Sequence, residues 1–144
     1  MITYFDTSAF VPLLIEEESS ERFSEMWKSS ERIASTRLLF VESAATLERA
    51  RRGGRIGQAS VDSATDLLHE LWHDIETIEL DGLLMQNAST VALRTGLKGY
   101  EAVHCAAALQ MIDEEVVAVA GDRRLLQVWS ELGLPTYGLG PNTA

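Results

Sequence analysis

Short runs of β-branched and aromatic residues alternate along the chain with longer segments in which apolar residues recur every three or four positions. The short runs are typical of strands, and the longer segments are typical of helices with one buried face. Strands are predicted at Ile2–Phe5, Ile33–Thr36, Glu76–Leu80, Val116–Ala120 and Leu134–Tyr137. Helices are predicted from Thr7 or Ser8 to Leu14, from Ser19 or Ser20 across Phe23, Met26 and Trp27, and over Leu38–Arg52, Gln58–Trp72, Leu83–Thr95, Tyr100–Met111 and Arg124–Leu132.

The alternation of strands and helices predicts an α/β fold, with a short, mainly parallel sheet of about four to five strands between layers of about seven helices. The run Val116–Ala120 is apolar throughout, as expected of a strand that helices cover on both faces. The length of 144 residues and the apolar content of 46% suit one domain, 1–144, with one sizeable core. They exclude a disordered chain, a collagen-like fibre and a small disulfide scaffold.

Cysteine use and hydropathy indicate the compartment. The single cysteine, Cys105, cannot form an internal disulfide and suits a reducing cytosol. No apolar run approaches the roughly 18 residues of a membrane span, and the N-terminus lacks the basic region of a signal peptide. We therefore expect a cytoplasmic protein without a membrane partner.

The charge is unevenly distributed along the chain. The net charge of −10 argues against a general nucleic-acid binder, which would show a basic surface. Residues 36–58 nevertheless carry five arginines and only two acids, so one basic island lies in an acidic protein. Acids that cluster to hold a cation would also make the formal charge misleading.

Two aspartates lie where parallel sheets place their sites, directly beyond the carboxyl ends of strands. Asp6 follows the first strand, and Asp122 follows the strand at 116–120 after Gly121, which permits a sharp turn. If these strands are neighbours, the two carboxylates meet at one edge of the sheet. Capping of the next helix explains each aspartate taken singly, but two such residues favour a site.

Two glutamates also have unusual surroundings. Glu42 lies among apolar residues of a predicted helix, where an acid is rarely buried without a partner. Glu101 begins an otherwise apolar helix, where a favourable interaction with the helix dipole is an equally good explanation. Four carboxylates in one cleft would repel one another, and a hard divalent cation such as Mg²⁺ or Mn²⁺ relieves that repulsion. Such a site activates water and neutralises charge on a phosphodiester.

The chain resembles PIN-domain ribonucleases, and within that group the VapC-type toxins of toxin–antitoxin pairs. Four segments in the family's order and spacing carry the resemblance across essentially the whole chain: Tyr4–Phe10, Val41–Glu42, Tyr100–Leu109 and Gly121–Leu125. The first and third segments are fairly specific together. One position departs from the family, which normally has aspartate where this chain has Glu101, so this carboxylate lies one methylene further from the backbone.

The resemblance implies a PIN-like three-layer sandwich and a metal-dependent endoribonuclease. Mg²⁺ or Mn²⁺ would be the cofactor, RNA the substrate and an antitoxin the protein partner, and the products would carry 5′-phosphate and 3′-hydroxyl ends. The catalytic and metal-binding residues that it implies are Asp6, Glu42, Glu101 and Asp122.

Neighbouring residues have candidate supporting roles. Thr7 and Ser8 are candidates to orient Asp6 or a metal-bound water, although each also suits a helix cap. Basic residues near the predicted cleft are candidate contacts for RNA phosphates, or else a solvated helix end: Arg49, Arg52, Arg123 and Arg124.

Two groups of residues favour ordinary structural roles. His104 lies three residues after Glu101, and a satisfied, half-buried histidine is a better interpretation than a general base. One helix stripe pairs two aspartates with two histidines, and a solvated face explains it better than a transition-metal site; its members are Asp62, Asp66, His69 and His73.

We also expect a homodimer. Three large apolar residues are candidates for its interface, although burial in the core explains them equally well: Trp27, Trp72 and Trp129.

Two other classes of function are weighed against the nuclease. One is a catalytically weak PIN-like module that binds RNA or a partner protein without efficient cleavage. The other is a Mg²⁺-binding phospho-receiver or a phosphatase of the haloacid dehalogenase type. A receiver would need paired acids after the first strand, and such a phosphatase would need an aspartate in place of Ser8, so both are disfavoured.

Overall fold

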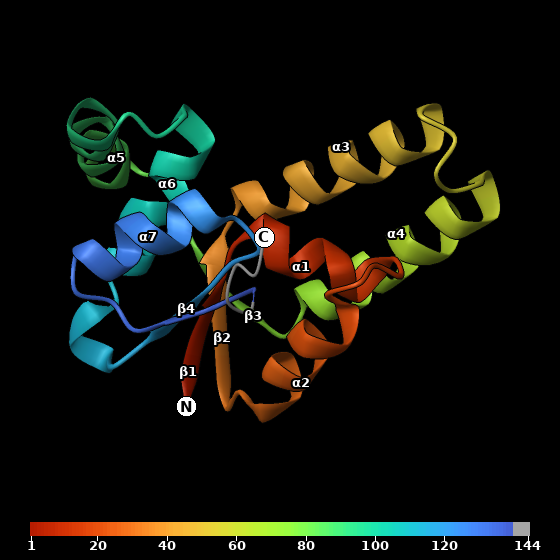
Figure 1. The fold of residues 1–144 in the computed structure, drawn as a ribbon, viewed down its shortest axis with the longest axis horizontal. Coiled ribbons are helices and arrows are strands. Elements are labelled where there is room, and N and C mark those ends of the chain that lie inside the picture. The colour runs from red at the N-terminus through yellow and green to blue at the C-terminus, as the bar shows by residue number, and fades with distance from the viewer. Residues whose placement is uncertain (140–144) are drawn as a thin grey trace.

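In the computed structural model, which describes residues 1–139, five strands form one parallel sheet in the order β3-β2-β1-β4-β5. Helices lie on both sides of this sheet (Figure 1). The strands are β1 Ile2–Phe5, β2 Arg32–Thr36, β3 Ile75–Ile78, β4 Val117–Val119 and β5 Thr136–Tyr137. The helices are α1 Thr7–Leu14, α2 Ser20–Ser29, α3 Leu38–Arg52, α4 Gln58–Trp72, α5 Gly82–Thr95, α6 Gly99–Leu109 and α7 Arg123–Glu131, with a short 3₁₀ turn, η1, at Ile112–Glu114.

Alternation along β1 divides the core into two layers, one on each face of the sheet. Tyr4 packs with the alanine-rich α6 and with Trp129 of α7 on one face. Its neighbour Phe5 packs with residues of α1, α2, α3 and α4, such as Phe10, on the other face. Successive residues of a strand point to opposite faces, so a strand buried on both sides needs apolar residues throughout. The predicted three-layer α/β architecture with a parallel sheet is confirmed.

The elements agree with the sequence pattern except at their ends. The helix after β1 begins at Thr7 and is capped by Asp6, so the prediction of a Thr7 or Ser8 cap is wrong. The strand predicted at Glu76–Leu80 lies at Ile75–Ile78, and the last strand is only Thr136–Tyr137. Residues 140–144 of the predicted domain lie outside the described residues. Among residues 1–139, no helix combines the length and the apolar character that a membrane crossing requires.

The three tryptophans differ in burial. Trp129 is 0% exposed, packs edge-on against Tyr4 at a centroid distance of 5.9 Å, and donates a hydrogen bond to the carbonyl oxygen of Cys105. Its interpretation as a dimer-face residue is therefore wrong, because it belongs to the core. Trp27 and Trp72 are half-buried and pack against aromatic neighbours in the other layer.

The strand order brings together two aspartates that are distant in sequence. β1 and β4 are hydrogen-bonded neighbours, with Phe5 opposite Val119, and the backbone N–H of Asp6 donates to the carbonyl of Val119. Asp6 and Asp122 therefore follow adjacent strands at the same edge of the sheet. The two strands are neighbours, as a shared site for the two carboxylates requires.

Candidate active site

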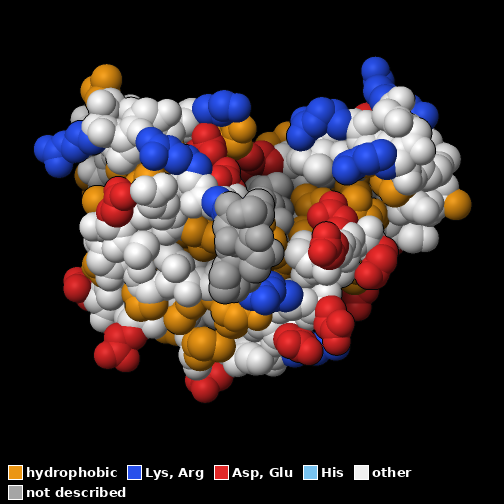
Figure 2. Space-filling model, in the orientation of Figure 1, with side chains coloured by type: hydrophobic (Ala, Val, Ile, Leu, Met, Phe, Trp, Pro, Cys, Tyr) orange, Lys and Arg blue, Asp and Glu red, His pale blue; other side chains and the backbone are white. Residues whose placement is uncertain are grey.

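A cleft of about 680 Å³ opens at the carboxyl edge of the sheet, with α1 and α3 on one side and the start of α6 and the turn before α7 on the other. Acidic side chains form its floor, and Lys and Arg side chains lie on both rims (Figure 2). All four acids singled out in the sequence line this cleft, together with the two hydroxyl residues that follow Asp6; the six are Asp6, Thr7, Ser8, Glu42, Glu101 and Asp122. Glu17 lines it as well, and nothing in the sequence pattern marks that residue.

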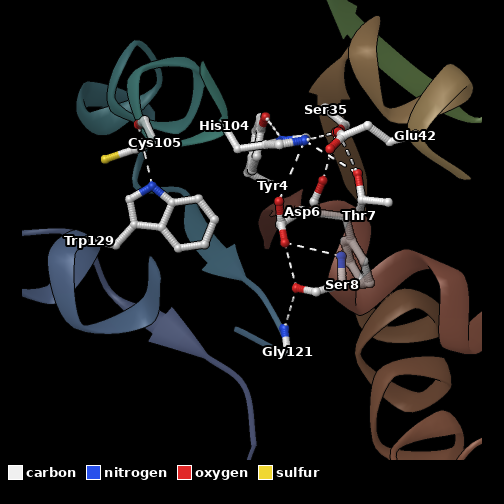
Figure 3. Close-up of polar contacts among 11 residues, drawn as sticks. Tyr4, Asp6, Thr7, Ser8, Ser35, Glu42, His104, Cys105, Gly121 and Trp129 are labelled. Atoms are coloured by element: carbon white, nitrogen blue, oxygen red, sulfur yellow. Dashed lines mark hydrogen bonds and ion pairs between the residues drawn. The ribbon is translucent and has the colours of Figure 1, made fainter. Parts of the chain in front are cut away.

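Asp6 is held by the start of α1 and by Ser8. Its Oδ2 accepts hydrogen bonds from the backbone N–H and the hydroxyl of Ser8, and only 7% of the residue is exposed. The Ser8 hydroxyl in turn accepts a 2.8 Å hydrogen bond from the backbone N–H of Gly121 (Figure 3). Asp6 thus caps a helix and faces the cleft at the same time, so capping and site geometry do not exclude each other.

Glu42 reaches the cleft from α3 and is held by two side chains. Its Oε1 accepts hydrogen bonds from the hydroxyl of Thr7 at 2.8 Å and from Nε2 of His104 at 2.7 Å. The same ring nitrogen lies 3.5 Å from Oδ1 of Asp6. These contacts explain how an acid is accommodated beside an apolar helix face, because the half-buried carboxylate has specific donors.

Glu101 and Asp122 form the other side of the acidic floor. Asp122 caps α7 by accepting from the backbone N–H groups of Arg124 and Leu125, and Oε1 of Glu101 accepts from that of Lys98 at the start of α6. Burial raises the pKa of the Glu101 carboxyl, and the adjacent Asp122 raises it further. Each acid therefore has the capping role that the sequence left open, and each also lines the cleft.

The donor set suits a hard divalent cation in its chemistry. The acids offer oxygen atoms only, which Mg²⁺ and Mn²⁺ prefer, and the raised pKa of Glu101 beside Asp122 is the kind of like-charge contact that a cation relieves. Among residues 1–139, no three ligating side chains lie close enough together to enclose an ion as they stand. A cation would therefore have to draw the carboxylates inward.

The four arginines predicted to contact RNA occupy different positions. Arg49 lines the acidic cleft, whereas Arg123 lines a neighbouring pocket beside Ser8. Arg52 is exposed and lies 3.8 Å from Glu48. Arg124 donates to the carbonyl of Thr95 and ties the start of α7 to the end of α5. Of the four, Arg49 lines the same cleft as the acids.

The role of His104 was missed in the sequence. Its ring is 0% exposed rather than half-buried, and it contacts Glu42 and Asp6, not Glu101 on its own helix. Helical spacing gave only the proximity to Glu101, because the contacts with Glu42 and Asp6 arise from tertiary packing. The sequence offered one signal for this contact: Glu42 lies among apolar residues and needs a partner, and His104 lies in a helix that is otherwise mostly apolar.

The histidine-and-aspartate stripe on α4 is a solvated face. All four of its side chains are exposed, and the ring of His69 packs against Phe40 at a centroid distance of 5.1 Å. Asp62 accepts a hydrogen bond from the amide of Gln58. Exposure and local partners of this kind match the interpretation preferred in the sequence.

The chain is similar to named ribonucleases in sequence and to solved toxin structures in fold. Ribonuclease VapC45 from Mycobacterium tuberculosis is 34% identical over 124 residues, which cover 86% of each chain. The Sarcin-Ricin loop cleaving toxin VapC20 from Mycobacterium tuberculosis superposes with a TM-score of 0.68 at 18% identity, over 93% of this chain and 96% of that one. VapBC-5 from the same organism, a member of the VapBC family of toxin–antitoxin systems, gives a TM-score of 0.56 at 12% identity, over 96% and 97% of the two chains.

No family model matches the chain. The structural matches are below 25% identity and establish the fold, which is that of the VapC toxins. The sequence match spans most of both proteins, and each of the four segments that resemble this family contributes at least one residue to the lining of the cleft. The chain belongs to the VapC ribonuclease family.

Proposed function

We propose that the chain is a metal-dependent endoribonuclease, the toxin of a toxin–antitoxin pair, and that Asp6, Glu42, Glu101 and Asp122 are its catalytic, metal-binding residues. The observation that carries the proposal is the convergence in one cleft of these four acids, two from helices α3 and α6 and two from the turns that follow β1 and β4. The family's ribonuclease name supports the reaction class. The oxygen-only donor set supports Mg²⁺ or Mn²⁺ as cofactor.

The chain's own residues prepare the site for hydrolysis of a phosphodiester. Bound Mg²⁺ or Mn²⁺ would supply an activated water and neutralise charge on the scissile phosphate. Asp6 and Glu42 are pre-oriented by hydrogen bonds from Ser8, Thr7 and His104. Asp122 is held by hydrogen bonds from the first turn of α7. Its carboxylate is therefore already oriented, and less rearrangement is needed when an ion binds.

Cleavage of structured or single-stranded RNA in about 5–10 mM Mg²⁺ or Mn²⁺, a range suited to weak carboxylate sites, tests this function. The ion should support cleavage, EDTA should stop it, and the products should carry 5′-phosphate and 3′-hydroxyl ends. Cleavage at the same rate without metal would contradict the mechanism. RNA binding without cleavage would favour the alternative of a catalytically weak binding module.

We also propose that Arg49 contacts RNA phosphates, with Arg52, Arg123 and Arg124 extending the track along the rims. The position of Arg49 in the lining of the acidic cleft supports this. Arg49→Ala should weaken RNA binding and lower the slope of log affinity against log salt by about 0.7, the value for one phosphate contact on a single strand. Arg32→Ala is the matched control, because Arg32 begins β2 at the opposite edge of the sheet and pairs with Glu76. An unchanged slope for Arg49→Ala would remove it from the track.

The proposed protein partner is a cognate antitoxin that places an arginine or lysine among the four acids. Such a side chain would mimic the charge of the cation and exclude it from the cleft. Mixing with the antitoxin should abolish cleavage, and high salt should weaken the exposed part of the contact. An inhibitory complex whose acidic cleft still admits Mg²⁺ would contradict this mode of inhibition.

We propose, finally, that the chain forms a homodimer. An apolar groove between α3 and α4 supports it, with Val41 59% exposed at its edge. Val41→Glu should convert a dimer to a monomer in light scattering. Leu93→Glu, at an exposed position on α5 outside the groove, should leave the protein dimeric, with the solution mass of the wild type.

A further inference from the structure

One buried histidine joins a buried tyrosine to the acidic cleft. His104 of α6 is 0% exposed, and its Nδ1 lies 2.7 Å from the hydroxyl of Tyr4 in β1. Its Nε2 lies 2.7 Å from Oε1 of Glu42 and 3.5 Å from Oδ1 of Asp6. Figure 3 shows the ring between Tyr4 on one side and the two acids on the other. The contact therefore links the core to the candidate metal ligands.

The hydrogen-bond partners determine which way this link runs. A carboxylate only accepts hydrogen bonds, so Nε2 of His104 carries a proton and donates to Glu42. Burial, reinforced by Asp6, raises the pKa of the Tyr4 phenol well above its usual range, so the phenol stays neutral. It can donate to a neutral Nδ1 or accept from a protonated one. In both charge states of the ring, its Nε2–H points at Glu42.

Within residues 1–139, the Glu42 side chain accepts two hydrogen bonds, and both go to Oε1. Thr7 and His104 donate them from different elements, α1 and α6. Oε2 is thereby left as the oxygen to meet a cation. A glutamate on a helix otherwise samples several rotamers, and freezing them opposes binding. Two donors to one oxygen establish the orientation before any ion arrives.

We propose that His104, braced by Tyr4, is a positioning residue that orients the Glu42 carboxylate toward the cleft beside Asp6, so that fewer side-chain rotamers remain to be frozen when a metal ion binds. The inference rests on the proposed metal-dependent function. The geometry argues against a general-base role, because Nε2 already carries the proton that it donates to Glu42 and the ring has no exposed surface from which to reach an attacking water. Partners of metal ligands are typically worth 10–100-fold in affinity or activity.

Two amide variants separate positioning from core filling. In His104→Gln the side-chain amide reaches about as far as Nε2 and can still donate to Glu42, whereas the amide of His104→Asn is too short. We expect His104→Asn to weaken Mn²⁺ binding about tenfold, at the low end of that range, in titrations followed by electron paramagnetic resonance of free Mn²⁺. His104→Gln should stay within about threefold of wild type. Metal-supported RNA cleavage should fall in the same order.

Two further variants keep the inference testable if His104→Asn folds poorly. Tyr4→Phe keeps the buried ring and removes only the hydroxyl that braces His104. Mn²⁺ affinity should therefore fall about threefold, less than in His104→Asn, because Tyr4 acts on Glu42 only through His104. Val103→Ala removes buried methyl groups from the adjacent position of α6 and should lower the melting temperature without changing Mn²⁺ affinity.

The outcomes distinguish this inference from the function beneath it. A wild-type chain that neither binds Mn²⁺ nor cleaves RNA overturns both. A wild type that binds the ion, with His104→Asn and Tyr4→Phe unchanged, overturns the positioning role alone. Loss of Mn²⁺ affinity in Val103→Ala to the same extent as in His104→Asn would also overturn it, because the effect would then follow stability.

Discussion

The hydroxyl of Ser8 accepts a 2.8 Å hydrogen bond from the backbone N–H of Gly121. Ser8 lies in the first turn of α1, directly after β1, and Gly121 lies in the loop between β4 and α7, 113 positions away in sequence. Since Ser8 also donates to Asp6, this single hydroxyl ties one candidate ligand to the loop that carries Asp122. The approach is close, because a Cβ at position 121 would lie 2.9 Å from the carbonyl oxygen of Ser8.

Gly121→Ala should therefore force the two turns apart. The clash is with backbone, which cannot swing away, so we expect a loss of about 1–3 kcal/mol in the free energy of unfolding, measured by denaturant titration. RNA cleavage should also fall, as Asp122 moves from Asp6. Gly82→Ala is the control, because a Cβ there meets nothing within 4 Å, and its stability should stay within about 0.5 kcal/mol of wild type. Equal stability of the two variants would show that the Ser8–Gly121 contact is dispensable.

Asp6→Asn should abolish RNA cleavage and growth inhibition on expression while leaving the fold intact. Asparagine caps helices as well as aspartate does, so α1 keeps its start and the carboxylate charge alone is lost. Asp81→Asn makes the same change at the cap of α5, outside the cleft, and should retain activity. Cleavage rates and circular dichroism of the two proteins make the comparison. An active Asp6→Asn chain would mean that Asp6 does not bind a catalytic metal.

The periodic pattern predicted most elements because both core layers depend on it. A helix such as α3 buries one stripe, including Leu39 and Leu47, so its apolar residues recur every three or four positions. A strand such as β4 is buried on both faces, so it is apolar throughout. Element ends were less predictable. Asp6, rather than Thr7 or Ser8, caps α1, because all three are good caps and only the backbone conformation distinguishes them.

The site was predictable in its composition but not in its internal contacts. Asp6 and Asp122 directly follow predicted strands, and sites in parallel sheets lie beyond the carboxyl ends of the strands, so the sequence alone marks both residues as candidates. The contact between His104 and Glu42 joins residues 62 positions apart and arises because α6 packs on the sheet, against β2 and in the same core layer as Tyr4. Glu17 enters the cleft from the segment between α1 and α2, where no periodicity exists to mark it.

Glu101→Gln should stabilise the metal-free protein at neutral pH. Burial and Asp122 raise the pKa of Glu101 in the folded state, so the folded chain binds more protons than the unfolded chain as the pH falls toward the ordinary value of 4.5. The charged carboxylate thus costs stability at pH 7, and the cost disappears as it is protonated. Glutamine removes the charge and still accepts the hydrogen bond from Lys98.

Thermal melts in EDTA at a series of pH values measure this effect. The variant should melt higher than wild type at pH 7, and the difference should shrink as the pH falls. Glu115→Gln, at an exposed position after η1, is the control and should show no such trend. A difference between Glu101→Gln and wild type that is constant with pH would show that the charge of Glu101, and with it the cost of its burial and of the repulsion from Asp122, is not the cause.

Glu101→Asp should raise Mg²⁺-supported cleavage by about tenfold, the equivalent of roughly 1.4 kcal/mol in the barrier. Glu101 has one more rotatable bond to freeze than an aspartate has, and its Oε1 is already engaged by the backbone N–H of Lys98. Mg²⁺ demands near-ideal octahedral geometry, whereas Mn²⁺ should tolerate the longer side chain better. The ratio of Mg²⁺-supported to Mn²⁺-supported rates should therefore be higher in Glu101→Asp than in wild type. If the substitution leaves both rates and their ratio unchanged, residue 101 does not bind the catalytic metal, and its contribution reduces to the hydrogen bond that begins α6.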